Sequence, residues 1–162
     1  MLFQDPALGT AYVAPPTNSL DPSAGQLRVL AVDDNVDAAT SLCVLLEAIG
    51  CKTAVAFCAA SALQLAQSFQ PHLVVLDLNM PGTDGCQLLS RIRESAGQVS
   101  GALFVCLTGS GQLSDEQRCI DAGFHRFVRK PITPDTIDAL LAEVRSRFGF
   151  ECTACEASSA HD

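Results

Sequence analysis

Apolar and polar positions follow two alternating patterns along the chain. Short apolar runs, of the length that suits a buried strand, are each followed by a segment whose apolar residues recur at helical spacing. The strand-like runs are Leu27–Val32, Lys52–Phe57, Leu73–Leu76, Leu103–Leu107 and Arg126–Val128. The helical segments are Asp37–Ile49, Ala60–Ser68, Gly85–Glu94, Ser114–Ala122 and Pro134–Phe148. The pattern therefore predicts strands that alternate regularly with helices.

Turn-forming residues mark the boundaries of these segments. Gly50 and Gly123 directly follow helical patterns, where glycine favours a helix stop. Pro134 lies in the first turn of the last helix, where a missing N–H costs little. The run Met80–Gly82 predicts a loop after the third strand.

The order of these elements predicts the fold class. Strands that alternate with helices through short connections form a parallel sheet covered by helices on both faces. Right-handed crossovers divide the helices between the two faces. The sequence therefore predicts an open, doubly wound α/β sandwich. Ligands of such folds bind beyond the carboxyl ends of the strands.

Both ends of the chain differ from the middle in composition. Residues 1–26 are rich in proline, glycine, serine, threonine and alanine, and we interpret them as a flexible leader. Residues 149–162 are small and acidic and predict a disordered tail, so that 27–148 is the folded domain. The formal net charge of −8 argues against non-specific binding to nucleic acid or to an anionic membrane.

Neither a membrane span nor a disulfide framework is expected. No apolar run reaches the roughly 20 residues that a transmembrane helix needs, and the first residues lack the basic region of a secretory signal. We therefore expect a cytoplasmic protein. The chain has 8 cysteines, most of them within apolar periodic segments, where cysteine behaves as a small buried hydrophobe. The pair Cys152 and Cys155, with His161 nearby, is a weak metal motif, because a zinc site usually has four ligands.

Polar residues with chemical potential stand at the ends of the predicted strands. They are Asp33, Asp34, Asp77, Thr108 and Lys130. Because parallel strands end on one edge of a sheet, these side chains should converge on one rim. Clustered carboxylates repel one another and persist readily around a cation, and an all-oxygen ligand set with retained waters suits Mg²⁺. Such a cation with a lysine and a hydroxyl group suits phosphoryl transfer to a carboxylate nucleophile.

These residues resemble the response-regulator receiver domains of two-component signal transduction, including the single-domain chemotaxis regulators. The matching stretches are Val29–Asn35, Leu73–Gly85, Cys106–Gly109 and Ala122–Pro131. The resemblance covers about residues 27–146 and is specific, because the motif residues follow in the right order on the right elements. It implies a (βα)5 flavodoxin-like fold with the parallel strands in the order 2-1-3-4-5.

The resemblance implies a role for each residue of the acidic pocket. Asp77 is expected to be the phosphoacceptor. Asp33 and Asp34 are the acidic pair that holds Mg²⁺ together with Asp77, and Asp34 is the more direct ligand. Asn79 is expected to offer its backbone carbonyl to the metal.

Further residues correspond to the family's switch. Thr108 and Lys130 are expected to bind the phosphoryl group, and Phe127 matches the switch aromatic. Asn79 and Ser110 are expected to tune the phosphoryl lifetime. The resemblance also makes the peptide bond that precedes Pro131 a candidate for the cis form, which X–Pro bonds adopt at small cost.

The family's biology supplies expected partners. A histidine kinase or a histidine phosphotransfer protein would donate the phosphoryl group, and a downstream protein target would read the face formed by the fourth helix, fifth strand and fifth helix. A receiver catalyses only its own phosphorylation and dephosphorylation, so we do not expect this chain to be an enzyme that acts on another substrate. We also expect no DNA-binding output domain, and hence no contact with nucleic acid by this chain alone. The sequence leaves open whether the chain forms a homodimer.

Other functions agree less well with the motif. An aspartyl-phosphate phosphatase usually has a second acid two residues after the nucleophile, where this chain has Asn79. Asp33 and Asp34 would repel a flavin phosphate, and the P-loop pattern of nucleotide enzymes is absent. The strongest alternative is a docking scaffold that binds partners regardless of phosphorylation. A phosphate sink, or an excised receiver of a hybrid histidine kinase, also stays open.

Overall fold

The computed structural model describes residues 11–13, 26–95, 101–109 and 111–150. The chain divides into one unit that ends at Ile132 and a second unit that begins at Thr133. The first unit contains the sheet and most of the helices. The second contains helix α5 (Pro134–Phe148) and is described by itself.

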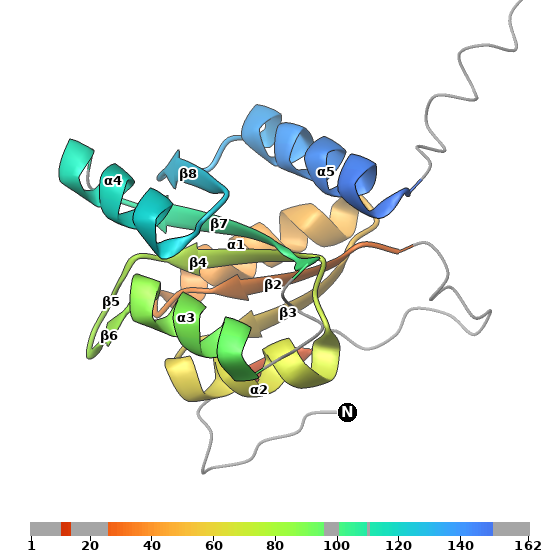
Figure 1. The fold of residues 1–162 in the computed structure, drawn as a ribbon. Helices are drawn as coiled ribbons and strands as arrows, with labels where there is room; N and C mark the ends of the chain where they lie inside the picture. Colours follow the sequence, from red (N-terminus) through yellow and green to blue (C-terminus); the bar gives the residue numbers. More distant parts are fainter. Residues whose placement is uncertain (1–10, 14–25, 96–100, 110, 151–162) are drawn as a thin grey trace, which may run out of the picture. The chain divides into compact units, whose positions relative to one another are not determined.

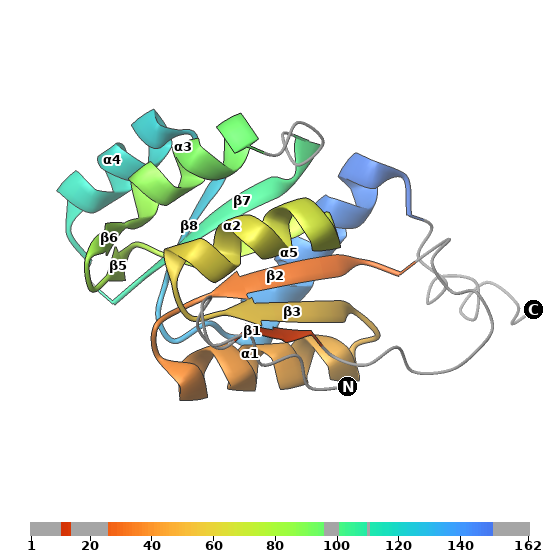
Figure 2. The same cartoon turned by 90° about the horizontal axis from the view of Figure 1, so that it is seen from below.

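A parallel sheet forms the centre of the first unit. Its strands are β2 (Arg28–Val32), β3 (Lys52–Ala56), β4 (Leu73–Asp77), β7 (Leu103–Thr108) and β8 (Arg126–Arg129). They lie in the order β3-β2-β4-β7-β8 (Figures 1 and 2). Counted along the chain, this is the order 2-1-3-4-5, which confirms the predicted topology.

One strand was not predicted from the sequence. Strand β1 (Ala11–Val13) lies inside the segment that we interpreted as a flexible leader, and it pairs antiparallel with β3. This short segment carries no sustained period that would reveal a strand. The pairing becomes possible because β3 is the last parallel strand and offers unpaired backbone groups along its outer side.

Helices cover both faces of the sheet in the first unit. They are α1 (Val36–Ala48), α2 (Ala59–Phe69), α3 (Gly85–Ser95) and α4 (Leu113–Ala122). Helix α1 lies on one face, whereas α2 and α3 lie on the other (Figure 2). Strands β4 and β7 are buried along their whole length, as expected for parallel strands in the middle of a sheet.

The main core lies between the sheet and helices α2, α3 and α4. Its largest fully buried members include Phe104, Leu88, Leu89 and Ile92. Alternate residues of the central strands point into this core, and the intervening ones point toward α1. The packing of this core fixes the strand ends relative to one another, and with them the polar residues that follow the strands.

Local signals in the sequence end and begin the helices where expected. The side chain of Asn35 accepts a hydrogen bond from the N–H of Ala38 at the start of α1. Gly50 follows α1 with φ of 95°. Its N–H donates to the carbonyl of Glu47, and the N–H of Cys51 donates to the carbonyl of Leu46, which together form a Schellman motif. In the second unit, Thr133 caps α5 by accepting from the N–H of Thr136.

The predicted loop after β4 is a small hairpin. Strands β5 (Asn79–Met80) and β6 (Thr83–Asp84) pair antiparallel across Pro81 and Gly82, and Gly82 has φ of 72°. The hairpin directly follows Asp77. It therefore forms one wall of the rim at which the polar strand ends meet.

None of the described cysteines is in a disulfide, and most are buried as predicted. Cys43, Cys51, Cys106 and Cys119 are buried, whereas Cys58 and Cys86 are half-buried. Cys152 and Cys155 lie outside the described residues. Among the residues that the structure describes, no helix is both long and apolar enough to span a bilayer.

A histidine joins two strands at the end of the sheet opposite the acidic residues. His72 Nδ1 accepts a hydrogen bond from the N–H of Arg28, at 3.0 Å. The Arg28 guanidinium is held nearby by the carbonyls of Phe69 and Gln70. Burial, and secondly the charge of Arg28, lower the pKa of His72 to about 4. The imidazole therefore acts as a neutral hydrogen-bond acceptor.

This contact should make the fold sensitive to acid. The folded pKa of His72 lies below the unfolded value, so its contribution to stability is complete above about pH 6.5 and is lost as the pH falls toward 4. His72→Asn keeps an acceptor that does not titrate, and we expect it to lose less stability than the wild type between pH 6.5 and 4. His72→Ala removes the acceptor and should destabilise the fold at every pH. Urea unfolding across this pH range measures both effects. An equal loss of unfolding free energy in the wild type and in His72→Asn between pH 6.5 and 4 would contradict the role of His72 as the titrating acceptor.

Candidate functional site

The carboxyl ends of the strands bring the predicted polar residues together. Asp33 directly follows β2, and its N–H donates to the carbonyl of Ala56 at 3.1 Å. Asp77 is the last residue of β4. Lys130 follows β8, and its N–H donates to the carbonyl of Thr108 at 2.8 Å. Backbone hydrogen bonds between neighbouring strand ends thus fix the positions of these residues independently of their side-chain contacts.

Asp33 and Asp77 are held by the same two kinds of contact. One carboxylate oxygen accepts the N–H two residues later, from Asn35 at 2.9 Å and from Asn79 at 3.2 Å respectively. The other oxygen faces Lys130, whose Nζ lies 2.7 Å from Asp33 Oδ2 and 3.3 Å from Asp77 Oδ2. Both aspartates are buried, with exposed fractions of 4% and 5%. Lys130 is therefore a counter-ion shared by two buried carboxylates.

Asp34 completes an acidic cluster at the surface. One oxygen from each of Asp33, Asp34 and Asp77 lies within 4.8 Å of the others. The side chain of Asp34 is exposed, in contrast to the other two. The cluster thus has two fixed, buried carboxylates and one that borders solvent.

The electrostatics of the cluster are strained by burial and by like charge. Burial raises the pKa of Asp77, and the charge of Asp33 raises it further, against the N–H of Asn79 and the ammonium of Lys130. Burial alone would lower the pKa of Lys130, but its hydrogen bond to Asp33 and the charges of both aspartates outweigh burial and raise it. A further positive charge in the cluster would relieve the repulsion between the carboxylates.

The donor set fits a hard divalent cation. All three converging side chains offer carboxylate oxygens, which Mg²⁺ and Ca²⁺ prefer over the softer ligands of zinc or copper. Three carboxylates leave coordination positions for water and for a substrate oxygen, as Mg²⁺ sites usually do. The structure places Asn79 at the same rim, with its N–H on Asp77. The residues present therefore fit the expected Mg²⁺ site.

The residues assigned to the switch lie on β7 and β8. Thr108, the last residue of β7, is fully buried. Phe127 pairs with Cys106, two residues before Thr108, and packs half-buried against the main core. Since side chains two residues apart point to the same face of a strand, Thr108 and Phe127 share one face of the sheet. The Lys130–Pro131 peptide bond is cis, as expected, whereas Ser110 lies outside the described residues.

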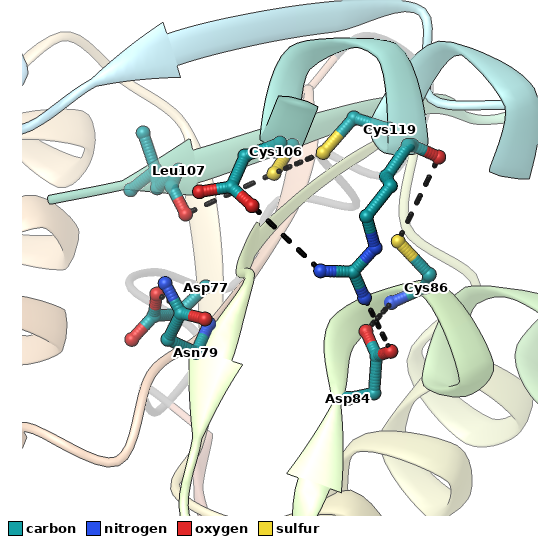
Figure 3. A network of polar contacts seen from close by, with 9 residues as sticks. Asp77, Asn79, Asp84, Cys86, Cys106, Leu107 and Cys119 are labelled. Carbon is teal, nitrogen blue, oxygen red and sulfur yellow. Dashed lines mark hydrogen bonds and ion pairs between the residues drawn. The ribbon is translucent and has the colours of Figure 1, made fainter. Parts of the chain in front are cut away.

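An open cavity of about 560 Å³ adjoins the acidic cluster. Asp34, Asn79, Asp84 and Arg118 are among the residues that line it. The Arg118 guanidinium lies 2.7 Å from Asp84 Oδ2, so that a residue of α4 reaches the hairpin next to Asp77. Figure 3 shows Asp77 and Asn79 across from Asp84.

Sequence reasoning assigned no role to Arg118 or Asp84. Arg118 lies on one surface of α4 with Asp115, three residues earlier, and such spacing usually indicates only an exposed helix face. The signal that links Arg118 to the site is its distance to Asp84, which no local pattern contains.

Comparison with protein families gives one match over most of the folded part. Residues 29–142 match the family described as the response regulator receiver domain. Two curated relatives are the DNA-binding response regulator MtrA of Mycobacterium tuberculosis, 32% identical over 120 residues, and the response regulator Rre1 of Synechocystis, 32% identical over 125 residues. These alignments cover 74% and 76% of this chain, but only 50% and 54% of the relatives. The chain thus spans about half the length of these response regulators.

The chain is also similar to a shorter relative and to solved structures. An uncharacterized 14.6 kDa protein of Leptolyngbya boryana is 36% identical over 110 residues, which are 67% of this chain and 82% of that protein. The chemotaxis protein CheY4 of Vibrio cholerae superposes with a TM-score of 0.68 at 25% identity, over 74% of this chain and 98% of CheY4. A CheY-like receiver domain from Methanospirillum hungatei JF-1 shares the fold, with a TM-score of 0.69 at 22% identity over 76% and 98% of the two chains.

Proposed function

Because this chain belongs to the response regulator receiver family, we propose that it accepts a phosphoryl group on Asp77 with Mg²⁺ as cofactor. The observation that carries the proposal is the setting of Asp77. It is a buried carboxylate at the end of a central strand, within 4.8 Å of two further carboxylates and 3.3 Å from a lysine ammonium. These are the groups that phosphoryl transfer to a carboxylate requires.

Asp33, Asp34 and Asp77 would hold the metal, with the Asn79 carbonyl as a further oxygen ligand. When bound, Mg²⁺ supplies positive charge that offsets the charge of the phosphoryl oxygens. Asp33 keeps one oxygen on the N–H of Asn35 and is therefore fixed in orientation. Asp34 is exposed and can adjust its position at little cost.

The chain's own residues then perform the transfer. A carboxylate oxygen of Asp77 attacks phosphorus in line, the bond from phosphorus to the donor breaks, and the donor leaves with its electron pair. Lys130 lies between Asp33 and Asp77 and can exchange one carboxylate for a phosphoryl oxygen. The Thr108 hydroxyl, at the end of the neighbouring strand, would donate to another. The natural donor would be a phosphohistidine of a histidine kinase or a histidine phosphotransfer protein.

We further propose that the signal leaves through β7, β8 and α4. If Thr108 turns toward the phosphoryl group, it vacates volume on the face that it shares with Phe127. Phe127 is half-buried and can fill this volume, which shifts the population between two packings of the same fold. In this scheme the chain catalyses only its own modification, and a protein target reads the outcome.

Phosphoryl uptake in the presence and absence of metal tests the proposal. Purified chain is incubated with a small phosphodonor such as acetyl phosphate, with Mg²⁺ or with a chelator, and analysed by intact-mass spectrometry. We expect a gain of one phosphoryl group that requires Mg²⁺ and that hydroxylamine removes, because hydroxylamine cleaves acyl phosphates but not phosphoserine. No gain by a chain with an intact fold would favour the docking scaffold instead.

A further inference from the structure

Helix α4 is attached to the rest of the first unit by few buried contacts. Within this helix, every residue of which is described, Cys119 is the buried side chain. Its large apolar residues Leu113 and Ile120 are 80% and 56% exposed. The ion pair between Arg118 and Asp84 is also exposed, and such pairs contribute little to stability. Against the core, α4 therefore contributes the buried Cys119 and the partly buried Ala122.

Cys119 contacts a second thiol. Its Sγ lies 3.0 Å from Sγ of Cys106 on β7, and both residues have an exposed fraction of 0%. Figure 3 shows the two sulfur atoms facing each other between the strand and the helix. They are only about 1 Å further apart than in a disulfide. Cys106 pairs with Phe127 in the ladder and precedes Thr108 by two residues.

We propose that Cys106 and Cys119 are a redox modification site, at which a reversible disulfide fastens α4 to β7. The oxidant is a peroxide. One thiol reduces hydrogen peroxide to water and becomes a sulfenic acid, and the second thiol attacks its sulfur and releases another water. Two thiols and one peroxide thus give one disulfide and two waters. An excess of a dithiol reduces this disulfide back to two thiols by thiol–disulfide exchange and is itself oxidised to a disulfide.

Burial decides when this reaction can occur. It raises the pKa of both Cys106 and Cys119, so that neither is a reactive thiolate while α4 is in place. Oxidation therefore requires α4 to move away from β7, and the disulfide forms when it returns. A third thiol, that of Cys86 on α3, also contacts α4. Its Sγ lies 3.8 Å from the carbonyl oxygen of Arg118. Cys86 is half-buried, and burial together with Asp84 raises its pKa to about 11.

The disulfide would limit the motion of one face of the domain. It joins α4 to the strand that ends at Thr108, so that β7 and α4 could no longer separate. The phosphoacceptor pocket keeps its own contacts, because neither cysteine lies among the carboxylates or Lys130. Oxidation should therefore leave phosphoryl uptake within about twofold of the reduced chain, an expectation that rests on the proposed function. Disulfide formation itself does not depend on phosphorylation. A failure of the disulfide proposal can therefore be distinguished from a failure of the proposed phosphoryl acceptance.

Peptide mapping tests the site directly. The reduced full chain is treated with hydrogen peroxide, remaining thiols are alkylated, and the products are digested with trypsin, which separates the two cysteines by cleavage after Arg118. We expect the linked pair Cys106–Cys119 to form at least tenfold faster than any other disulfide, to raise the melting temperature by about 5 °C or more, and to disappear with dithiothreitol. A dominant link from Cys86 to Cys119, or sulfenic acids without a disulfide, would overturn the proposal.

Native-state proteolysis tests the effect on α4. Cleavage after Arg118 in the folded chain requires local opening of the helix, so oxidation should slow it at least tenfold. Cys106→Ala should abolish this protection, whereas Cys43→Ala, which removes a buried thiol of α1, should keep it. Unchanged cleavage in the oxidised wild type would show that the bond does not restrain α4. Mapping of the wild type decides the proposal even if one variant folds poorly.

Discussion

Replacement of Asp77 by asparagine is expected to abolish phosphoryl uptake and, in the presence of a chelator, to raise the melting temperature by a few degrees. The amide cannot serve as the nucleophile that forms an acyl phosphate. The same substitution removes a buried charge that burial and Asp33 both disfavour, while its carbonyl oxygen can still accept the N–H of Asn79. Lys130 keeps its closer partner, Asp33, at 2.7 Å. Activity and stability should thus change in opposite directions.

Intact-mass spectrometry and thermal unfolding measure the two effects on the same samples. Asp84→Asn is the matched control, because Asp84 lines the same cavity but lies outside the acidic cluster. Its asparagine can still accept the N–H of Cys86, so α3 keeps this contact. The control should take up one phosphoryl group at about the wild-type rate. Full uptake by Asp77→Asn would place the phosphoacceptor at another residue.

Addition of Mg²⁺ provides an independent reading of the same cluster. A ligand that binds only the folded state raises its stability by mass action. The wild type should therefore gain melting temperature with increasing Mg²⁺, and Asp77→Asn should gain much less, because one of three carboxylates has lost its charge. An equal gain in both would mean that Mg²⁺ binds elsewhere on this acidic chain.

The sequence was sufficient to predict which residues meet at the rim, because the topology of the sheet alone brings them together. Asp33, Asp77, Thr108 and Lys130 each stand at the end of a strand, and parallel strands must end on the same edge. Once the strand order is fixed, these side chains meet whatever the details of core packing. Apolar runs are enough to locate such strands, and turn residues such as Gly50 and Gly123 mark the ends of the helices between them.

The features that escaped sequence reasoning depend on contacts between surfaces rather than between strand ends. The contact of Cys119 with Cys106 requires the rotation of α4 about its axis, which is set by packing. The pairing of Arg118 with Asp84 requires the same rotation together with the shape of the hairpin. The antiparallel strand β1 requires an open sheet edge, which no residue of β1 encodes. Each is specified by tertiary structure that local patterns do not contain.

Lys130→Ala is expected to separate the two roles of the lysine, as a counter-ion of the resting site and as a ligand of the phosphoryl group. Without the ammonium, the buried carboxylates of Asp33 and Asp77 face each other unpaired, and removing one partner of a buried pair is strongly destabilising. The variant should therefore melt well below the wild type in chelator. Phosphoryl uptake should fall by about 100-fold or more, the usual cost of deleting one fixed group that stabilises transition-state charge.

Magnesium should reverse one of these effects and not the other. A cation bound by the three carboxylates offsets their repulsion, so Mg²⁺ should restore much of the melting temperature of Lys130→Ala. It cannot replace the donor to the phosphoryl oxygen, so uptake should stay slow at saturating Mg²⁺. Arg129→Ala, which deletes an exposed positive charge one residue away, is the matched control and should change neither quantity. Uptake restored by Mg²⁺ alone would reduce Lys130 to a counter-ion of the resting site and leave phosphoryl binding to the metal and Thr108.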